Sequence, residues 1–323
     1  MHAKILVNDG MHPEGQKALE AAGHTVITDK IEQDLLPEQL PGFDAIIVRS
    51  ATTVRQDLID RCPNLKLIAR GGVGLDNIDV DYARKKGIVV YNTPAASSHS
   101  VAELVFAHAL NVARLLHQSN RAMPIEGDDN FKGLKKNFSS GIELCGKTIG
   151  IVGFGRIGQA VGRIALGIGM RVLAVDPMID KAHISIEVPG ASNKLELDIA
   201  TQDLEEILPE VDILTLHVPS MKTALIGREQ LQMMKKGVII INASRGGIID
   251  EDALIEALDA GHVAGAGLDV FVNEPSPSKR ILQHPKISLS PHIGASTDQA
   301  QINIGLELAE QINAYFSNGH ADH

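Results

Sequence analysis

The chain has 323 residues, of which 44% are hydrophobic and 22% are charged, and its formal net charge is −10. A length above ~250–300 residues favours two domains, and the composition is typical of a soluble globular protein. The negative charge, the 3% of aromatic residues and the absence of Trp argue against nucleic-acid binding. Such a chain repels phosphate backbones and offers few rings on which bases stack, so small anions in a local basic pocket are the expected partners.

The cysteines and the N-terminus favour a cytoplasmic protein. Cys62 and Cys145 are too few for a disulfide framework and lack metal-ligand spacing, so we expect a reducing compartment and no metal site. The N-terminus runs directly into a strand-like stretch without a signal-peptide layout. No window approaches the ~18 apolar residues of a membrane span, so we expect no membrane contact.

Short β-branched runs separated by helical patterns predict the secondary structure in chain order. The first series of strands is expected near Lys4, Ala45, Leu65 and Ile88. After residue 147 a second series follows in TIGIV, RVLAV, DILTLH, GVIIIN, AGLDV and KISLS. Strands that alternate with helices indicate parallel sheets covered by helices on both faces. The two series therefore predict two doubly wound α/β domains.

Two long helical patterns connect the series. The first covers 98–118 and opens with the capping-box spacing Ser100-Val-Ala-Glu103, and the second begins near Ser296 with the same spacing. If the second helix packs on the first sheet, residues 1–97 plus 293–323 form one discontinuous domain and 98–292 is inserted into it. The stretch 181–197 breaks the rhythm and is expected to form a hairpin without an assigned role.

A glycine pattern follows the strand expected at 148–152. Gly153, Gly155 and Gly158 have the spacing G-x-G-x-x-G, which alone is weak evidence in a chain with 30 glycines. Here a helical pattern and a second strand follow, and that strand ends at Asp176. Such glycines permit a tight turn, the approach of a pyrophosphate to backbone N–H groups and close helix packing. The sequence therefore predicts a dinucleotide site that prefers NAD to NADP, because Asp176 would bind ribose hydroxyls and repel a 2′-phosphate.

Three polar side chains follow later strands, at the edge where ligands of doubly wound sheets bind. Arg245 follows VIIINAS, Glu274 follows GAGLDVF and His292 follows ISLSP. Taken one at a time, Arg245 fits a surface cation, Glu274 a polar loop residue and His292 a structural histidine. Together they fit one reaction, because a guanidinium holds a carboxylate and an imidazole oriented by a carboxylate takes a hydroxyl proton. We therefore expect them to act on a 2-hydroxy acid whose C2 gives a hydride to a nicotinamide.

The stretches VGFGRIG, LHVP, INASRGGIIDEDAL, GAGLDVFVNEP and PHIGAST resemble the D-isomer-specific 2-hydroxyacid dehydrogenase family, and the resemblance covers nearly the whole chain. It implies an NAD-dependent dehydrogenase in which a Rossmann NAD-binding domain, 98–292, is inserted into a discontinuous, flavodoxin-like substrate-binding domain. Arg245 then binds the substrate carboxylate, His292 is the acid/base and Glu274 orients His292. Besides the three glycines and Asp176, the resemblance implies a cofactor site formed by Val73, Arg156, Ile157, His217, Val218, Pro219, Thr223, Ala243, Ser244, Arg245, Asp269, His292, Gly294 and Ala295.

Within the family, VRSATTV at 48, RGGVGLDNID at 70, NTPAASSHSVAEL at 92 and HIGASTDQAQINIGLE at 292 are similar to the phosphoglycerate dehydrogenase branch. The similarity implies oxidation of D-3-phosphoglycerate to 3-phosphohydroxypyruvate, the entry step of serine synthesis. A cation at Arg49 suits the substrate phosphate, although His99 stands where some relatives have arginine. The implied substrate site consists of Arg49, Ser50, Gly72, Val73, Gly74, Arg245 and His292.

Two other functions remain open at this point. The same chemistry on glyoxylate, hydroxypyruvate or a lactate analogue is one, and an NADH-sensing co-repressor on the same fold is the other. The resemblance further implies a homodimer that pairs through the NAD domain, with 98–118 as the contact surface. Many phosphoglycerate dehydrogenases have an additional serine-binding regulatory domain, which we expect this chain to lack together with its feedback inhibition.

Overall fold

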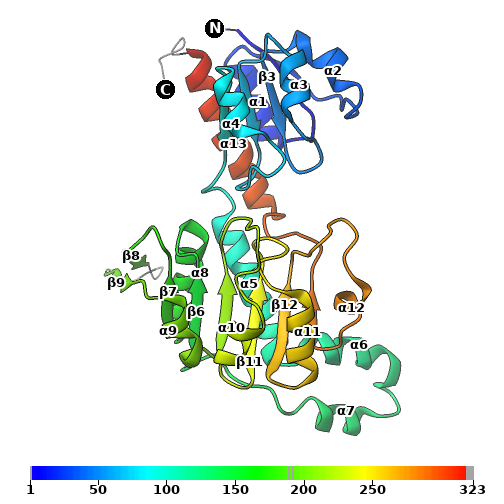
Figure 1. The fold of residues 1–323 in the computed structure, drawn as a ribbon, viewed down its shortest axis with the longest axis vertical. Coiled ribbons are helices and arrows are strands. Elements are labelled where there is room, and N and C mark those ends of the chain that lie inside the picture. The colour runs from blue at the N-terminus through cyan, green and yellow to red at the C-terminus, as the bar shows by residue number, and fades with distance from the viewer. Residues whose placement is uncertain (1, 188–189, 191–192, 318–323) are drawn as a thin grey trace. The chain divides into compact units, whose positions relative to one another are not determined.

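The computed structural model describes residues 2–187, 190 and 193–317, and it contains two compact units (Figure 1). One unit runs to Ser98 and resumes at Ala295, and the other is His99–Gly294. Each unit has one parallel sheet with helices on both faces, so the α/β fold predicted from the sequence is confirmed. No helix in the described ranges is long and apolar enough to cross a membrane.

The first sheet has the strand order β2-β1-β3-β4-β5, with all neighbours parallel. This is the flavodoxin-like order, and its switch point lies between β1 and β3. Four of the strands coincide with predicted ones, whereas β2 was missed because it has only three residues and none is fully buried. The bounds are β1 Lys4–Val7, β2 Thr25–Ile27, β3 Ala45–Val48, β4 Leu67–Arg70 and β5 Val89–Asn92.

Helices cover both faces of this sheet, and the sheet itself separates two clusters of core residues. Successive side chains of a strand point to opposite faces, so Ile46 packs in one cluster and Ile47 in the other. The face of Ile47 also buries Leu308 and Ile312 of the last helix, which returns from the far end of the chain. The helices are α1 Pro13–Ala21, α2 Leu36–Gln39, η1 Leu40–Gly42, α3 Gln56–Arg61, α4 Val80–Lys85 and α13 Asp298–Ser317.

The second sheet has the order β13-β12-β11-β10-β6-β7, again parallel throughout. Every strand of the second predicted series is present. The chain leaves β6 toward β7 on one side and returns to β10 on the other, so the switch point of the sheet lies beside β6. The bounds are β6 Thr148–Val152, β7 Arg171–Val175, β10 Ile213–Leu216, β11 Val238–Asn242, β12 Val263–Leu268 and β13 Ile287–Leu289.

The first long helix differs from the predicted one in its N-terminal cap and in its C-terminal end. The first connector begins at Ser98, so Ser100 lies inside it and the predicted capping box is wrong. It ends at Ala113 and not at 118, because Leu115 has a φ of 52° and starts a new helix. The helices are α5 Ser98–Ala113, α6 Leu116–Glu126, α7 Phe131–Asn137, α8 Arg156–Gly167, α9 Leu204–Ile207, η2 Leu208–Glu210, α10 Arg228–Met233, α11 Glu251–Asp259 and α12 Lys279–Leu282.

The hairpin predicted for 181–197 is confirmed in its described part. Strands β8 Lys181–Ile186 and β9 Leu195–Ala200 pair antiparallel, while residues 188–189 and 191–192 lie outside the described ranges. Ile184 is fully buried in the same cluster as Val161 of α8, so one face of the hairpin belongs to the core of the second unit.

Helices α1 and α13 cross at a pair of glycines. A Cβ atom added to Gly15 would lie 2.5 Å from the carbonyl oxygen of Gly305, which is closer than real Cβ atoms approach backbone. The cap of α13 lies one residue later than predicted. Thr297 provides it in place of Ser296, because Thr297 Oγ1 accepts a 3.1 Å hydrogen bond from the Ala300 N–H. The backbone contact between Gly15 and Gly305 thus joins α1 to α13.

We predict that Gly15→Ala lowers the free energy of unfolding by about 1–3 kcal/mol, because the new methyl group forces α1 and α13 apart. Gly167→Ala in α8 is the matched control, since an added Cβ there meets no described atom within 4 Å. It should be neutral or stabilising by up to about 1 kcal/mol, because alanine favours helix over glycine. Urea unfolding followed by circular dichroism measures both, and equal stability of the two variants would contradict the prediction.

Candidate active site

Most of the residues expected to bind the cofactor collect at one edge of the second sheet, whereas Val73 and Ala295 belong to the first unit. Because all six strands run parallel, the segments that follow them leave from the same edge. The glycine pattern follows β6, Asp176 follows β7, His217 follows β10, Ser244 and Arg245 follow β11, Asp269 follows β12 and His292 follows β13. Their neighbours Arg156, Ile157, Val218, Pro219 and Ala243 occupy the same segments, and Thr223 lies further along the exposed loop after β10.

The glycine turn has the shape that a pyrophosphate needs. Gly153 has a φ of +89°, and a Cβ there would lie 2.4 Å from the His217 carbonyl oxygen. A Cβ on Gly158 would lie 2.1 Å from the Gly153 carbonyl oxygen, so α8 sits directly on the turn. At Gly155, the N-cap of α8, an added Cβ would meet no described atom within 4 Å. The N-terminus of α8 therefore faces open space, which is where helix N–H groups bind phosphate.

Asp176 is tied to this turn. Its Oδ2 atom accepts a 2.8 Å hydrogen bond from the Phe154 N–H, and its Oδ1 atom accepts a 2.9 Å bond from the Met178 N–H. The carboxylate is thus held beside the second residue of the glycine turn, and it is only partly buried. The position is compatible with binding of ribose hydroxyls.

His217 contributes a buried polar atom without a protein partner. Its Nε2 atom lies 3.0 Å from Thr215 Oγ1, whereas Nδ1 is buried and has no hydrogen-bond partner in the described part of the chain. Burial lowers the pKa of His217 to about 3, so the ring is neutral at physiological pH. Together with the open helix N-terminus, this unused nitrogen fits a polar ligand such as a dinucleotide.

The turn after β11 shows why Arg245 stands between a serine and two glycines. Asn242 holds the turn, because its Oδ1 atom accepts from the Ser244 N–H at 3.0 Å and its Nδ2 atom donates to the Arg245 carbonyl at 2.9 Å. A Cβ on Gly246 would lie 1.9 Å from the Phe271 carbonyl oxygen, so this backbone presses on the loop that leads to Glu274. The Arg245 guanidinium donates through Nη1 to the Ser244 carbonyl at 2.7 Å, which keeps the side chain near its own turn.

Glu274 and His292 form a hydrogen-bonded pair, as predicted from their positions in the sequence. Glu274 Oε2 lies 2.8 Å from His292 Nδ1, and its Oε1 atom accepts a 2.9 Å bond from the Phe271 N–H. An ionised carboxylate can only accept, so Nδ1 carries the proton and Nε2 keeps its lone pair. The pair is therefore arranged as an imidazole base with an oriented tautomer.

Both loops of this pair contain a residue in the left-handed region. Asn273 has a φ of 62° and His292 a φ of 55°, which costs about 1–3 kcal/mol for a residue other than glycine. Asp269, 1% exposed, holds the second loop in place. Its carbonyl accepts from the His292 N–H at 2.8 Å, and its carboxylate accepts from the Ile293 and Gly294 N–H groups at 2.9 Å each.

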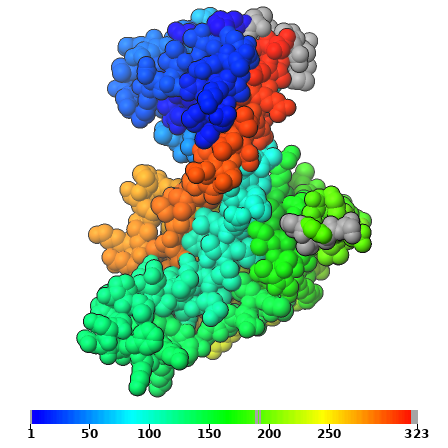
Figure 2. Space-filling model, turned by 180° about the vertical axis from the view of Figure 1, so that it is seen from behind, coloured from blue at the N-terminus to red at the C-terminus, as the bar shows by residue number. Residues whose placement is uncertain are grey.

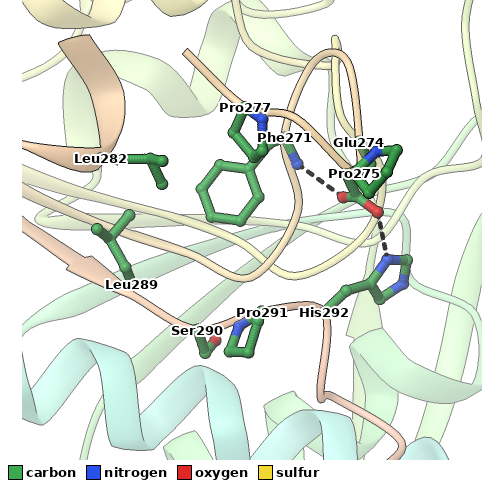
Figure 3. A pocket seen from close by; sticks show the side chains of 9 residues that line it. All are labelled: Phe271, Glu274, Pro275, Pro277, Leu282, Leu289, Ser290, Pro291 and His292. Atoms are coloured by element: carbon green, nitrogen blue, oxygen red, sulfur yellow. Dashed lines mark hydrogen bonds and ion pairs between the residues drawn. The ribbon is translucent and has the colours of Figure 1, made fainter. Parts of the chain in front are cut away.

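A cavity of about 410 Å³ opens beside the pair (Figure 3). The Glu274–His292 hydrogen bond lies at one end, and the side chains of Leu282 and Leu289 lie at the other, with the Phe271 ring between them. The described residues that line it include no lysine or arginine. The cavity therefore suits apolar groups better than a phosphate.

The residues assigned to substrate in the first unit lie at the carboxyl edge of its own sheet. Arg49 and Ser50 follow β3, and Gly72, Val73 and Gly74 follow β4. Sequence reasoning missed Arg70, which ends β4 as a second cation, and a Cβ on Gly72 would lie 2.2 Å from its Nη1 atom. The signal was a strand ending in arginine, LIAR, like the one that leads to Arg245. Ala295, assigned to the cofactor, also lies in this unit.

Known proteins resemble the chain over almost its whole length. A D-3-phosphoglycerate dehydrogenase of Methanocaldococcus jannaschii is 43% identical over 96% of this chain and 56% of its own length. A hydroxypyruvate reductase of Thermotoga maritima is 42% identical over 96% of this chain and 97% of its own length. The crystal structure of NAD⁺-bound 3-phosphoglycerate dehydrogenase of Entamoeba histolytica superposes with a TM-score of 0.77 at 29% identity, covering 100% of this chain and 98% of that one.

The chain thus spans about half the length of several of the curated relatives it matches, those named D-3-phosphoglycerate dehydrogenase. Residues 106–294 match the family described as D-isomer specific 2-hydroxyacid dehydrogenase, NAD binding domain. The matched segment contains the glycine turn and the Glu274–His292 pair. The chain belongs to the D-isomer specific 2-hydroxyacid dehydrogenase family.

Proposed function

We propose that the protein oxidises D-3-phosphoglycerate to 3-phosphohydroxypyruvate with NAD, the first reaction of serine synthesis. The observation that carries the proposal is the 2.8 Å hydrogen bond between Glu274 and His292, because it leaves Nε2 free to accept a proton. Relatives named D-3-phosphoglycerate dehydrogenase, about 40% identical, support the choice of substrate.

Each residue of the site then has a chemical task. The Arg245 guanidinium binds the α-carboxylate of the substrate in a bidentate fork. His292 Nε2 takes the proton of the C2 hydroxyl, and Glu274 stabilises the resulting imidazolium. The glycine turn and Asp176 hold NAD, which when bound supplies the acceptor for the C2 hydride. In the reverse direction the same imidazolium returns its proton to the keto oxygen.

The substrate phosphate is assigned to Arg49 and Arg70. The cavity beside His292 has no cation among its lining residues, all of which are described, so it is a poor phosphate site. Arg49 is fixed through its backbone, because its N–H donates to Asp9 Oδ2 at 2.6 Å and its carbonyl accepts from Asn77 Nδ2 at 2.7 Å. A guanidinium is the side chain best suited to phosphate.

Reduction of hydroxypyruvate is the second candidate. The Thermotoga maritima relative of that name is 42% identical and matches over 97% of its own length. The two candidates share the roles of Arg245, His292 and Glu274 and differ only in whether Arg49 contributes to binding.

A homodimer that pairs through the second unit is part of the proposal. Helices α6 and α7 extend away from the sheet of this unit (Figure 1), and this part of the chain protrudes in the space-filling view of Figure 2. They expose apolar side chains, with Ile125 79%, Phe131 58% and Leu116 56% exposed. In this proposal a second copy of the chain covers these side chains, next to the predicted contact segment 98–118. Sedimentation of a monomer at micromolar concentration would contradict this part.

We predict that His292→Ala lowers kcat by about 10²–10⁴-fold, because the proton acceptor is lost. Binding of NADH should stay within a few-fold, and its fluorescence reports it without interference because the chain has no Trp. Glu274→Gln should also lower kcat, since an amide can donate to Nδ1 and then permits the wrong tautomer. Unchanged turnover in His292→Ala would exclude this residue as the acid/base.

Asp176→Ala should raise the KM for NAD by roughly tenfold or more, the loss of a charged hydrogen bond, and affect NADP less. The reason is that the carboxylate binds ribose hydroxyls and repels a 2′-phosphate. Asp203→Ala is the control, because this exposed N-cap carboxylate of the same unit makes no capping bond. An equal loss for both cofactors would contradict the assignment.

Steady-state kinetics with 3-phosphoglycerate and with unphosphorylated D-glycerate separates the two candidate functions. We expect the wild type to prefer the phosphorylated acid, and Arg49→Ala to reduce that preference by roughly ten- to a hundredfold, the worth of one charged contact. Arg61→Ala, at the exposed end of α3, should leave it unchanged. A wild type that prefers glycerate, or reduces hydroxypyruvate with higher kcat/KM, would favour the second candidate.

A further inference from the structure

A line of polar side chains, of which His108, Ser288 and Asp269 are buried, runs from α5 to the loop that carries His292. His108 Nδ1 lies 2.9 Å from Ser288 Oγ, and His108 Nε2 lies 2.8 Å from Ser290 Oγ. Ser290 Oγ donates a 2.6 Å hydrogen bond to Asp269 Oδ1. At the other end, Asn111 Nδ2 donates to Ser288 Oγ at 3.3 Å. Sequence reasoning found neither His108 nor the two serines.

The donor and the acceptor of each hydrogen bond in this line follow from the groups at its two ends, Asp269 and Asn111. The Asp269 carboxylate can only accept, so the Ser290 proton points to it and the Ser290 oxygen accepts from His108. His108 therefore carries its proton on Nε2. Its Nδ1 atom then accepts from the Ser288 hydroxyl, whose oxygen accepts from Asn111. Every donor and acceptor of the neutral imidazole is used, and one tautomer alone satisfies the line.

The surroundings keep His108 neutral and in one orientation. Its side chain is 4% exposed, and burial lowers its pKa although the charge of Asp269 acts in the opposite direction. A Cβ added to Gly267 would lie 2.5 Å from His108 Cβ, so α5 lies directly on β12 at this residue. A ring packed this closely and bonded at both nitrogens has little freedom to rotate.

The far end of the line reaches the backbone of the proposed acid/base. Asp269 Oδ1 accepts from both Ser290 and the Ile293 N–H, and Oδ2 accepts from the Gly294 N–H. The carbonyl of Asp269 accepts from the His292 N–H at 2.8 Å. His292 adopts a φ of 55°, a conformation that persists only where neighbours hold it. The orientation of Asp269 therefore decides how the His292 loop is presented.

We propose that His108 and Ser290 are positioning residues for the reaction, which act through Asp269 to set the direction in which His292 presents Nε2. This inference rests on the proposed function, in which His292 moves the proton. Neither residue is assigned a contact with substrate or cofactor. Their effect is on the fraction of enzyme in which the imidazole is aligned with the hydroxyl, so it falls on kcat.

The experiment compares variants of the full chain that cut the line with variants that retain its hydrogen bonds. Ser290→Ala removes the donor to Asp269, and Ser290→Thr keeps a hydroxyl. His108→Leu keeps the bulk and removes the donor to Ser290, whereas His108→Gln retains an N–H near the Nε2 position. The control is His284→Leu, a buried histidine of the same unit whose bonds to Lys286 and Asp259 lie outside the line.

We expect Ser290→Ala and His108→Leu to lower kcat by roughly ten- to a hundredfold, the scale of a misplaced catalytic group. NADH affinity, measured by fluorescence, should stay within about twofold, because neither residue is part of the glycine turn. Ser290→Thr and His108→Gln should recover most of the turnover. The double variant Ser290→Ala with His108→Leu should be about as slow as the slower single variant, since both cut the same line. His284→Leu should lower the melting temperature and leave kcat unchanged.

Several outcomes would overturn the inference. One is an unchanged kcat in Ser290→Ala and His108→Leu together with a lower melting temperature, which shows a structural role alone. Another is a Ser290→Thr variant as slow as Ser290→Ala. If His108→Leu does not fold, Ser290→Ala decides, because it removes a single oxygen. Full activity of His292→Ala would instead reject the proposed function, so the two failures are distinguishable.

Discussion

The site depends on one hydrogen bond, that between the Glu274 carboxylate and His292 Nδ1. A neutral imidazole has two nitrogens, and without a partner either one can carry the proton. At 2.8 Å the carboxylate removes this ambiguity and leaves Nε2 of the neutral ring without a proton. The same carboxylate is itself fixed by the Phe271 N–H at 2.9 Å, so the orientation passes from backbone to side chain to ring. The proton transfer proposed for His292 presupposes this choice of tautomer.

The parallel sheet supplies the frame for that bond, and glycines permit its close contacts. Gly246 allows the Arg245 turn to press on the Phe271 backbone, and Gly158 allows α8 to sit on the turn after β6. A side chain at either position would collide with a carbonyl oxygen, which cannot move away as the end of a flexible side chain can. Backbone contacts therefore fix the distances between the loops of the site. The polar side chains on these loops start from fixed backbone positions.

The sequence was sufficient to predict what depends on local pattern. Runs such as TIGIV and VIIIN specify buried strands, and a polar residue after such a run indicates a side chain at the sheet edge, which is why Arg245, Glu274 and His292 were proposed as site residues. Features that depend on distant contacts were not accessible. Strand β2 is three residues long and forms because β1 offers an edge, Leu115 ends a helix through its backbone conformation, and Thr297 caps α13 where the pattern favoured Ser296. His108 gave no local signal, because its partners Ser288 and Ser290 lie 180 and 182 residues away.

The return of α13 to the first sheet has a consequence for biosynthesis. Ile304, Leu308 and Ile312 of α13 share a cluster with Ile5 and Val7, so part of one face of the first sheet stays uncovered until residues 298–317 have left the ribosome. The second unit, His99–Gly294, is continuous and can complete its core earlier. The nascent chain therefore carries this unfinished apolar surface for as long as residues 99–294 are being made.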